Sequence, residues 1–285
     1  MTGDIIAKIK SGYNQFTNAE KQVASYITSN VQDVLFMSIT DLADACGVGD
    51  TTVFRFCKSL GLKGYQEFKM KLSLSISDGK EEMDQYTGNN IEADDSVLDI
   101  AKKVLATNIK ALEETYSLIN EENIDKAIEM FYEAKKVYFF GVGSSMLTAM
   151  KATNKFLRIE NKVYCVEDSH MQAMMAATMT QDDLAIFISY SGATKDTIHV
   201  AKLAKDAGAK IACITRFNKS HLTVYADVVL LTGANEGPLQ GGSTSSEISM
   251  LYLIDVLYTE YYKRYFEKCS KNNAKTTGSI SEKLY

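Results

Sequence analysis

The stretch Ala185-Ile186-Phe187-Ile188-Ser189-Tyr190-Ser191-Gly192-Ala193-Thr194 decides how the rest of this chain is interpreted. An apolar run of strand length gives way to small hydroxyl residues and a glycine, and a helix-compatible segment, 195–204, follows at once. Free backbone N–H groups and the helix dipole converge at such a junction, where Ser189, Ser191 and Thr194 add hydroxyl donors. The stretch therefore predicts a phosphate site at the end of a buried strand. The alternative is an ordinary turn whose Ser and Thr side chains only cap the helix.

A second junction of the same kind lies upstream, where the apolar run 136–140 ends in Gly141-Val142-Gly143-Ser144-Ser145. Ligands sit at the carboxyl ends of strands in an open parallel sheet, so two such ends can close on one molecule. The second junction lacks the third glycine of the dinucleotide fingerprint, because Met146 stands in its place. We therefore expect no nicotinamide cofactor, and no cofactor of another kind is indicated.

Length and charge limit the class of protein. The chain has 285 residues, which is enough for two domains with separate cores, and a net charge of -5. A pI near 5.4 does not favour nucleic-acid binding over the whole surface, so local charge must decide that question. No apolar run approaches the roughly 18 residues of a membrane span, and the N-terminus has no signal-peptide core. We expect a soluble, cytoplasmic protein.

The cysteines point to structural thiols. There are 5, at positions 46, 57, 165, 213 and 269, and no two of them form a Cys-x-x-Cys pair. This pattern fits reduced side chains and offers no metal-ligand spacing, so we expect no metal site.

Residues 1–77 are predicted to be helical with short breaks. Thr17 and Glu20 form a capping-box pattern before the first long helix. Further on, a helix over 39–46, a turn at Gly47-Val48-Gly49 and a second helix over 51–60 match the helix-turn-helix signature.

The second of these helices is a candidate DNA reader. Its apolar residues Val53, Phe56, Cys57 and Leu60 are expected to be buried, which leaves a hydroxyl and basic face outward. Between positions 51 and 72 the net charge is +4, which suits DNA, although a solvated helix face would also carry such charge. The candidate DNA contacts are Thr51, Thr52, Arg55, Lys58, Ser59 and Lys63.

Residues 78–95 are polar and acidic and are predicted to be a linker, with an ordered acidic loop as the alternative. A long amphipathic helix follows. Its apolar stripe consists of Leu98, Leu105, Ile109, Leu112, Tyr116 and Ile119.

From residue 137 onward strands and helices alternate, which predicts a parallel sheet flanked by helices within a domain over 96–268. The last helix, about 245–267, carries more apolar and aromatic surface than one sheet face needs. We expect that surplus to be buried against a second copy in a homodimer or a dimer of dimers. Residues 269–285 are predicted to be a frayed polar tail.

The order of these parts resembles the RpiR family of bacterial transcription regulators, in which an all-α helix-turn-helix domain precedes an α/β sugar isomerase (SIS) domain. The N-terminal similarity is carried by Leu42-Ala43, Val48, the run TVFRFCKSLGLKGY over 52–65, and Phe68-Lys69. The C-terminal similarity is carried by GVGSS over 141–145, Asp168-Ser169-His170, SYSGATK over 189–195, and ADVVL over 226–230.

The resemblance implies a phosphorylated sugar as ligand. Its phosphate would be held by the Ser189, Ser191, Gly192 and Thr194 turn, and its sugar end would be approached by Gly143, Ser144 and Ser145. Ser245 and Ser246, at the start of the last helix, complete the candidate set. The chain departs from the family pattern at Ser220-His221-Leu222, where Ser-Pro-Leu is frequent, and at Glu247, where Arg is common.

Two main functions compete. The first is a regulator of carbohydrate genes that binds an inverted-repeat operator and responds to a phosphosugar. The second is a sugar-phosphate aldose–ketose isomerase, since the fold alone does not settle function. An isomerase needs a positioned base, and the candidates His170, His199, His221, Glu167, Glu236 and Glu247 show no paired arrangement. Residues 1–77 would serve no purpose in an isomerase, so we expect a regulator and no enzyme. A purely structural dimer would explain neither site.

Overall fold

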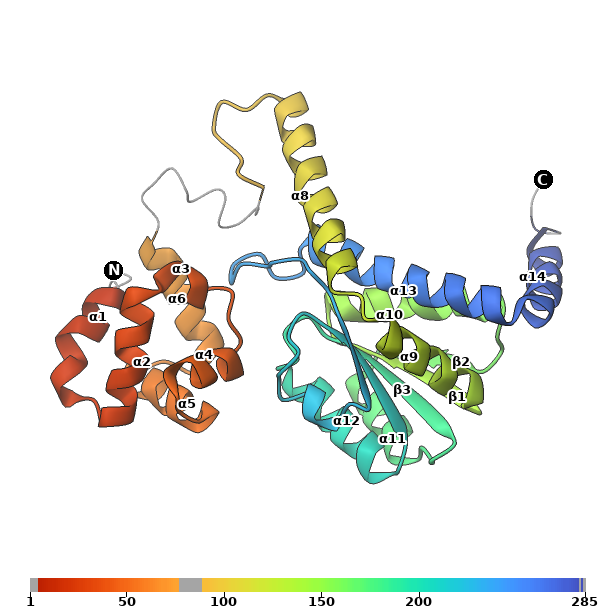
Figure 1. The fold of residues 1–285 in the computed structure, drawn as a ribbon, viewed down its shortest axis with the longest axis horizontal. Coiled ribbons are helices and arrows are strands. Elements are labelled where there is room, and N and C mark those ends of the chain that lie inside the picture. Colours follow the sequence, from red (N-terminus) through yellow and green to blue (C-terminus); the bar gives the residue numbers. More distant parts are fainter. Residues whose placement is uncertain (1–4, 77–88, 282, 284–285) are drawn as a thin grey trace. The chain divides into compact units, whose positions relative to one another are not determined.

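The computed structural model describes residues 5–76, 89–281 and 283 (Figure 1). By their contacts the residues form two compact units, Met1–Ile109 with Asn235–Ser243, and Lys110–Ala234 with Thr244–Tyr285. The boundary between the units falls inside one long helix, and each unit is described by itself.

The first unit is helical. Its elements are α1 (Ile5–Gly12), η1 (Tyr13–Gln15), α2 (Asn18–Ser29), α3 (Val31–Val34), α4 (Ile39–Cys46), α5 (Asp50–Ser59), α6 (Tyr65–Ile76) and the first half of α8 (Val97–Ser117). Thr17 caps α2 in a capping box with Glu20, as predicted, and Ser38 caps α4 in the same manner with Asp41. In the core of this unit the Phe56 ring makes edge-to-face contacts with the rings of Phe16 and Phe68.

The helix-turn-helix comprises α4 and α5. Gly47 ends α4 in the left-handed conformation at φ 65°, and the Val48 N–H donates to the Ala43 carbonyl at 2.9 Å. The hydroxyl of Thr40 donates to Asp50 Oδ2 at 3.0 Å and so fixes the start of α5 against α4. The turn that the sequence predicted is confirmed.

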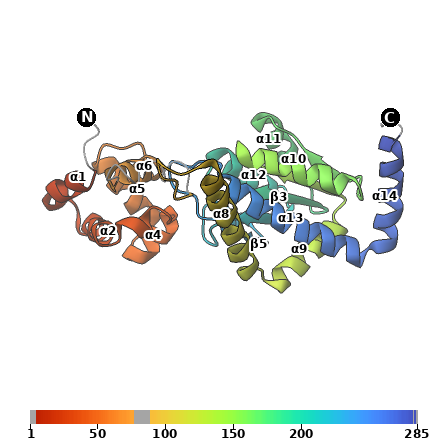
Figure 2. The same ribbon diagram turned by 90° about the horizontal axis from the view of Figure 1, so that it is seen from above.

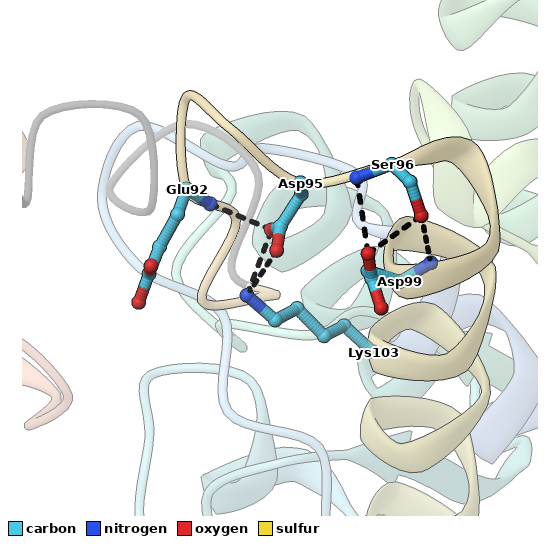
Figure 3. A network of polar contacts seen from close by, with 5 residues as sticks. All are labelled: Glu92, Asp95, Ser96, Asp99 and Lys103. Atoms are coloured by element: carbon cyan, nitrogen blue, oxygen red, sulfur yellow. Dashed lines mark hydrogen bonds and ion pairs between the residues drawn. The ribbon is translucent and has the colours of Figure 1, made fainter.

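Helix α8 begins at a capping box (Figure 3). The Asp99 N–H donates to Ser96 Oγ at 3.3 Å, and Asp99 Oδ2 accepts from the Ser96 N–H at 3.1 Å. Upstream, Asp95 Oδ2 accepts from the Glu92 N–H at 2.7 Å and lies 2.7 Å from the Lys103 ammonium. The hydrogen bond from Lys103 lowers the pKa of Asp95. The end of the acidic segment is thus tied to the helix, whereas residues 78–88 of the predicted linker lie outside the described residues.

Most of the apolar stripe of α8 faces the solvent, and the buried face of the helix is a different one. Ile119, which follows the helix, is half-buried against the second unit's core. Ala111 and Thr115 are buried, while Leu98, Leu105 and Tyr116 are 81%, 60% and 70% exposed. The side chain of Thr115 accepts from the Gly233 N–H at 3.0 Å, and a Cβ on Gly233 would lie 2.4 Å from the Thr115 nitrogen. Close backbone approach therefore decides which side of α8 is buried.

The second unit is an α/β layer structure. Its helices are α9 (Glu121–Glu133), α10 (Ser144–Leu157), α11 (Ser169–Ala177), α12 (Lys195–Asp206), η2 (Thr223–Tyr225), α13 (Thr244–Arg264) and α14 (Phe266–Ser281). Its strands are β1 (Lys136–Phe140), β2 (Val163–Cys165), β3 (Asp183–Ile188), β4 (Lys210–Thr215) and β5 (Val228–Leu231).

The 5 strands are parallel in the order β2-β1-β3-β4-β5, and helices cover both faces (Figures 1 and 2). Alternate strand residues enter separate cores, because side chains of a strand point to opposite faces. Phe139 and Ile186 pack with α9, α10 and α13, whereas Phe140 and Phe187 pack with α11 and α12. The predicted fold class, a helical N-terminal part followed by a parallel α/β sheet, is confirmed.

Part of the apolar surplus of α13 is absorbed within the chain. Ile254, Leu257 and Tyr261 are buried in the same core as α9 and α10, and the Tyr261 ring lies 5.0 Å from that of Phe131. The remaining apolar residues of the surplus are half-buried, namely Ile248, Leu251, Tyr252, Val256 and Tyr258. Their burial against a second copy stays a prediction.

Helix α14 replaces the predicted frayed tail. Asn272 Nδ2 donates to the Ile159 carbonyl at 2.8 Å, and Cys269 is fully buried. Next to it, the hydroxyl of Tyr261 donates to Glu160 Oε1 at 2.6 Å, and the Lys268 ammonium lies 2.5 Å from the same oxygen. Glu160 is only 4% exposed, and these two partners satisfy its buried carboxylate.

Candidate functional site

The two stretches singled out in the sequence meet at the switch point of the sheet. Strand β1 continues through α10 to β2 on one side, and β3 continues through α12 to β4 on the other. The connections after these neighbouring strands therefore diverge, which opens a crevice beyond their carboxyl ends. Phe140 of β1 and Phe187 of β3 are paired in register, so the two following turns begin side by side.

The turn after β3 is shaped by its own hydroxyl groups. Ser189 is 4% exposed, and its Oγ accepts from the Gly192 N–H at 3.2 Å. Ser191 Oγ accepts from the Ala193 N–H at 3.2 Å. Thr194 is the N-cap residue of α12, yet its side chain makes no capping hydrogen bond. The first turn of α12 thus keeps donors that a capping Thr194 side chain would have used.

Gly192 fits this turn for two reasons. Its φ is 58°, a conformation that residues with a side chain rarely adopt. A Cβ there would also lie 2.1 Å from Ser220 Oγ. The Gly192 carbonyl accepts from the Leu222 N–H at 3.0 Å, so the segment 220–222 is held against the turn.

The turn after β1 leads into a second helix N-terminus. Gly141 is buried, and a Cβ on it would lie 2.7 Å from the Ser145 carbonyl oxygen. Gly143 is the N-cap residue of α10 at φ 62°, and no atom lies within 4 Å of the position that its Cβ would occupy. Ser144 is exposed and Ser145 half-buried. This turn is open to a ligand on the side of Gly143.

The start of α13 lies beside α10. Glu247 Oε1 accepts from the Lys151 ammonium at 2.8 Å, so the acid that departs from the family pattern is neutralised by a base from the neighbouring helix. Ser246 is 4% exposed and Ser245 is half-buried. The ion pair of Glu247 with Lys151 joins this helix start to α10.

The candidate histidines lie on separate elements. His170, His199 and His221 are exposed and belong to α11, α12 and the loop after β4. Glu236 accepts from the Ser243 N–H at 3.2 Å within its own loop. Within residues 5–76, 89–281 and 283, no group of three or more His, Cys, Asp or Glu side chains is arranged to hold a metal ion.

The basic face of α5 is exposed as predicted at Thr51, Arg55 and Lys58, and Lys63 follows in the loop. Thr52 is the exception. It is 8% exposed and points inward, so its expected outward position is wrong, and Arg55 Nη2 lies 3.5 Å from its hydroxyl.

Ser59 is exposed, but its hydroxyl is already engaged. It donates to Glu20 Oε1 on α2 at 2.8 Å. Burial alone would raise the pKa of Glu20, but the hydrogen bonds from Thr17 and Ser59 and the charge of Arg55 lower it. Glu20 therefore stays ionised beneath the basic face and orders the residues around it.

Sequence reasoning missed Phe54. Its ring is 44% exposed on the outward side of α5, and the Lys58 ammonium lies 5.3 Å from the ring centroid. Helical spacing carries the signal, because position 54 follows Thr51 by three residues and precedes Lys58 by four, which puts all three on one side of the helix.

Both parts of the chain match known protein families. Residues 3–79 match the model of the helix-turn-helix domain of the rpiR family, and residues 130–260 match that of the SIS domain. Among the described residues no helix combines the length and apolar character that a membrane crossing requires.

Three proteins illustrate the similarity. An uncharacterized HTH-type transcriptional regulator of Haemophilus influenzae is 33% identical over 281 residues, which cover 99% of this chain and 98% of that protein. The HTH-type transcriptional regulator HexR of Pseudomonas aeruginosa is 33% identical over 74% of this chain and 73% of its own length. The structure of Vibrio vulnificus NanR complexed with ManNAc-6P superposes with a TM-score of 0.87 at 29% identity and covers 98% of both chains. The chain belongs to the rpiR family of helix-turn-helix transcriptional regulators.

Proposed function

We propose that this protein is a cytoplasmic transcription regulator of carbohydrate genes, that its α5 enters the major groove of an inverted-repeat operator, and that a phosphorylated sugar controls its affinity for that operator. DNA reading belongs to residues 1–77 and effector binding to residues 96–268, with residues 78–95 between them. One observation supports the effector assignment most directly. Thr194 is the N-cap residue of α12 at the switch point, but its side chain makes no capping hydrogen bond.

The phosphate is assigned to the turn after β3. A dianion gains most where uncapped N–H groups and a helix dipole point at it, and α12 offers both next to the Ser191 and Thr194 hydroxyls. The exposed Ser144 and the open side of Gly143 suit the hydroxyl groups of a sugar. The complex of NanR with ManNAc-6P, a sugar phosphate, supports this ligand class.

An enzymatic role is not part of the proposal. Isomerisation requires a base placed against the bound sugar, and the histidines are spread over separate elements. Glu247, which lies at the start of α13, is committed to its ion pair with Lys151. The same crevice can bind a sugar phosphate without such a base.

The exposed stripe of α8 supports a dimer. Leu98, Leu105 and Leu112 recur every seven residues, and Lys102, Ile109 and Tyr116 form a second series with the same period. Two interleaved series of this kind are the a and d positions of a coiled coil, in which one Lys at an a position sets the register. We infer that α8 of one copy packs against α8 of another, which suits an operator with two half-sites.

The effector assignment is tested by thermal unfolding of the full-length protein with ManNAc-6P, other hexose phosphates and the corresponding free sugars. A ligand at about 100 times its Kd adds roughly 2.7 kcal/mol to the free energy of unfolding, which raises Tm by several degrees. We expect stabilisation by at least one phosphorylated sugar, none by its unphosphorylated form, and a weaker effect in Thr194→Val. Equal stabilisation of Thr194→Val and the wild type would place the phosphate elsewhere.

A further inference from the structure

Phe54 is an exposed aromatic residue in the middle of a polar, basic helix face. Its neighbours Val53 and Phe56 are fully buried, whereas the Phe54 ring is 44% exposed. Thr51 and Lys58 lie one turn away on the same side of α5, and Arg55 follows it directly. Apolar surface in contact with water is unfavourable, so burial of the ring against a binding partner would lower the free energy of the complex.

The ring is held in place. The Lys58 ammonium lies 5.3 Å from its centroid on one side. On another side the backbone of Gly64 is so close that a Cβ there would lie 3.3 Å from Phe54 Cε2. Because Gly64 has no side chain, the ring rests against the loop before α6. An apolar group that is already ordered loses little conformational entropy when it meets a partner.

The charges around the ring identify that partner. An apolar protein surface laid over Phe54 would have to desolvate the ammonium of Lys58 and the guanidinium of Arg55, which lie on the same helix face. A DNA major groove places phosphates where these cations can pair with them. Within the groove, the apolar group that a base presents is the 5-methyl of thymine.

We propose that Phe54 contacts the 5-methyl group of a thymine in each half-site and thereby sets a base preference of α5. The inference rests on the proposed function and adds a specificity residue to it. Lys58 holds the ring and contacts the backbone, while Arg55 reads an adjacent base or phosphate. A wild-type regulator then prefers thymine over uracil at one position of the half-site, since the two differ there only by the methyl group.

The experiment uses an operator selected from random-sequence duplexes by the full-length protein. Each thymine of the selected site is replaced in turn by deoxyuridine, and Kd is measured for the wild type, Phe54→Ala and Phe36→Ala. Phe36 is the matched control, because it is 43% exposed and lies outside α5. Unfolding curves establish that the variants remain folded.

We expect one deoxyuridine substitution per half-site to weaken wild-type binding about fourfold, the factor that corresponds to roughly 0.8 kcal/mol for one buried methyl group. Phe36→Ala should show the same sensitivity, and Phe54→Ala should bind the two duplexes equally. Wild-type binding that ignores every methyl group, or Phe54→Ala binding that remains sensitive, overturns the inference while leaving the proposed function intact. Failure of the wild type to select any sequence overturns both.

Discussion

A Cβ atom on Gly192 would lie 2.1 Å from the Oγ of Ser220, so the turn after β3 and the loop after β4 fit together only because position 192 has no side chain. We predict that Gly192→Ala destabilises the fold by about 1–2 kcal/mol through its left-handed backbone, plus the cost of displacing Ser220. Urea unfolding of the variant and of the wild type measures the difference.

The double variant Gly192→Ala/Ser220→Gly separates the backbone cost from the clash. It keeps an alanine at position 192 but removes the hydroxymethyl group that the new Cβ would meet. With Ser220→Gly alone as its reference, it should lose less stability than Gly192→Ala loses relative to the wild type. If both losses are equal, Ser220 moves aside freely and the close fit has no energetic weight.

Different single substitutions should weaken effector binding and DNA binding, each without affecting the other. Ser191→Ala removes a hydroxyl from the phosphate turn, and a hydrogen bond to a charged group is worth about 1.5–3 kcal/mol, so Kd for the phosphosugar should rise roughly ten- to hundredfold. Operator binding without effector should hardly change.

Arg55→Ala should give the opposite result. It should weaken specific DNA binding by about 1–3 kcal/mol if the guanidinium reads a base, with effector affinity retained. Lys10→Ala, a change of an exposed lysine on α1, is the control for general loss of charge. Titration of each variant with operator and with effector checks the predictions for Ser191→Ala and for Arg55→Ala. An Arg55→Ala protein that binds the operator like the wild type would show that α5 is not the recognition helix.

Dimerisation through α8 should be sensitive to charge on its stripe. Ile109 is 46% exposed at an a position, and Ile109→Glu would bury a carboxylate against its counterpart in the second copy. Sedimentation at micromolar concentration should show twice 31.6 kDa for the wild type and 31.6 kDa for the variant. Lys110→Glu, on the neighbouring exposed position, should remain dimeric. A dimeric Ile109→Glu protein would assign the interface to another surface.

Lys69 should make stability depend on pH. Burial lowers its pKa from 10.5 to about 8, although the charges of Asp41 and Glu236 oppose the shift. Between these values the unfolded chain binds more protons than the folded one, so the free energy of unfolding rises as the pH increases from about 8 to 10.5. The contribution is on the order of 3 kcal/mol. It is fully present above the unfolded pKa and is lost as the pH falls through 8.

The Lys69 contribution is isolated by comparing variants. Lys69→Met should flatten this part of the pH–stability curve relative to the wild type. Lys71→Met, on the same helix but with a side chain 38% exposed, should leave the curve unchanged. Parallel curves for the wild type and Lys69→Met would mean that the ammonium finds enough solvation in the folded state.

Local chemistry made much of this structure predictable. Caps such as Thr17 with Glu20, and the glycine turns at Gly47 and Gly192, depend on residues a few positions apart and were identified from their spacing. The strand ends at the switch point followed from two apolar runs that end in small residues. Such features need no knowledge of the rest of the fold.

The features that the sequence did not predict depend on contacts between segments that are far apart in the chain. The phase of α5 relative to its core buries Thr52, and sequence alone does not fix that phase to within one residue. α8 buries its Thr115 side because Gly233 comes so close to it. α14 is held by bonds such as that of Asn272 to Ile159, which no local pattern reveals.

The buried carboxylate of Glu160 has a practical consequence for dissecting the protein. Sequence similarity to the SIS domain ends at residue 260, one residue before Tyr261, whose hydroxyl Glu160 requires. A fragment cut at that boundary would leave a 4%-exposed carboxylate without Tyr261 or Lys268 and would remove α14 from the surface that it covers. The segment that matches the SIS family is thus shorter than the segment whose contacts complete this core, so we expect expression fragments that extend through Ser281 to be more stable than fragments that end at residue 260.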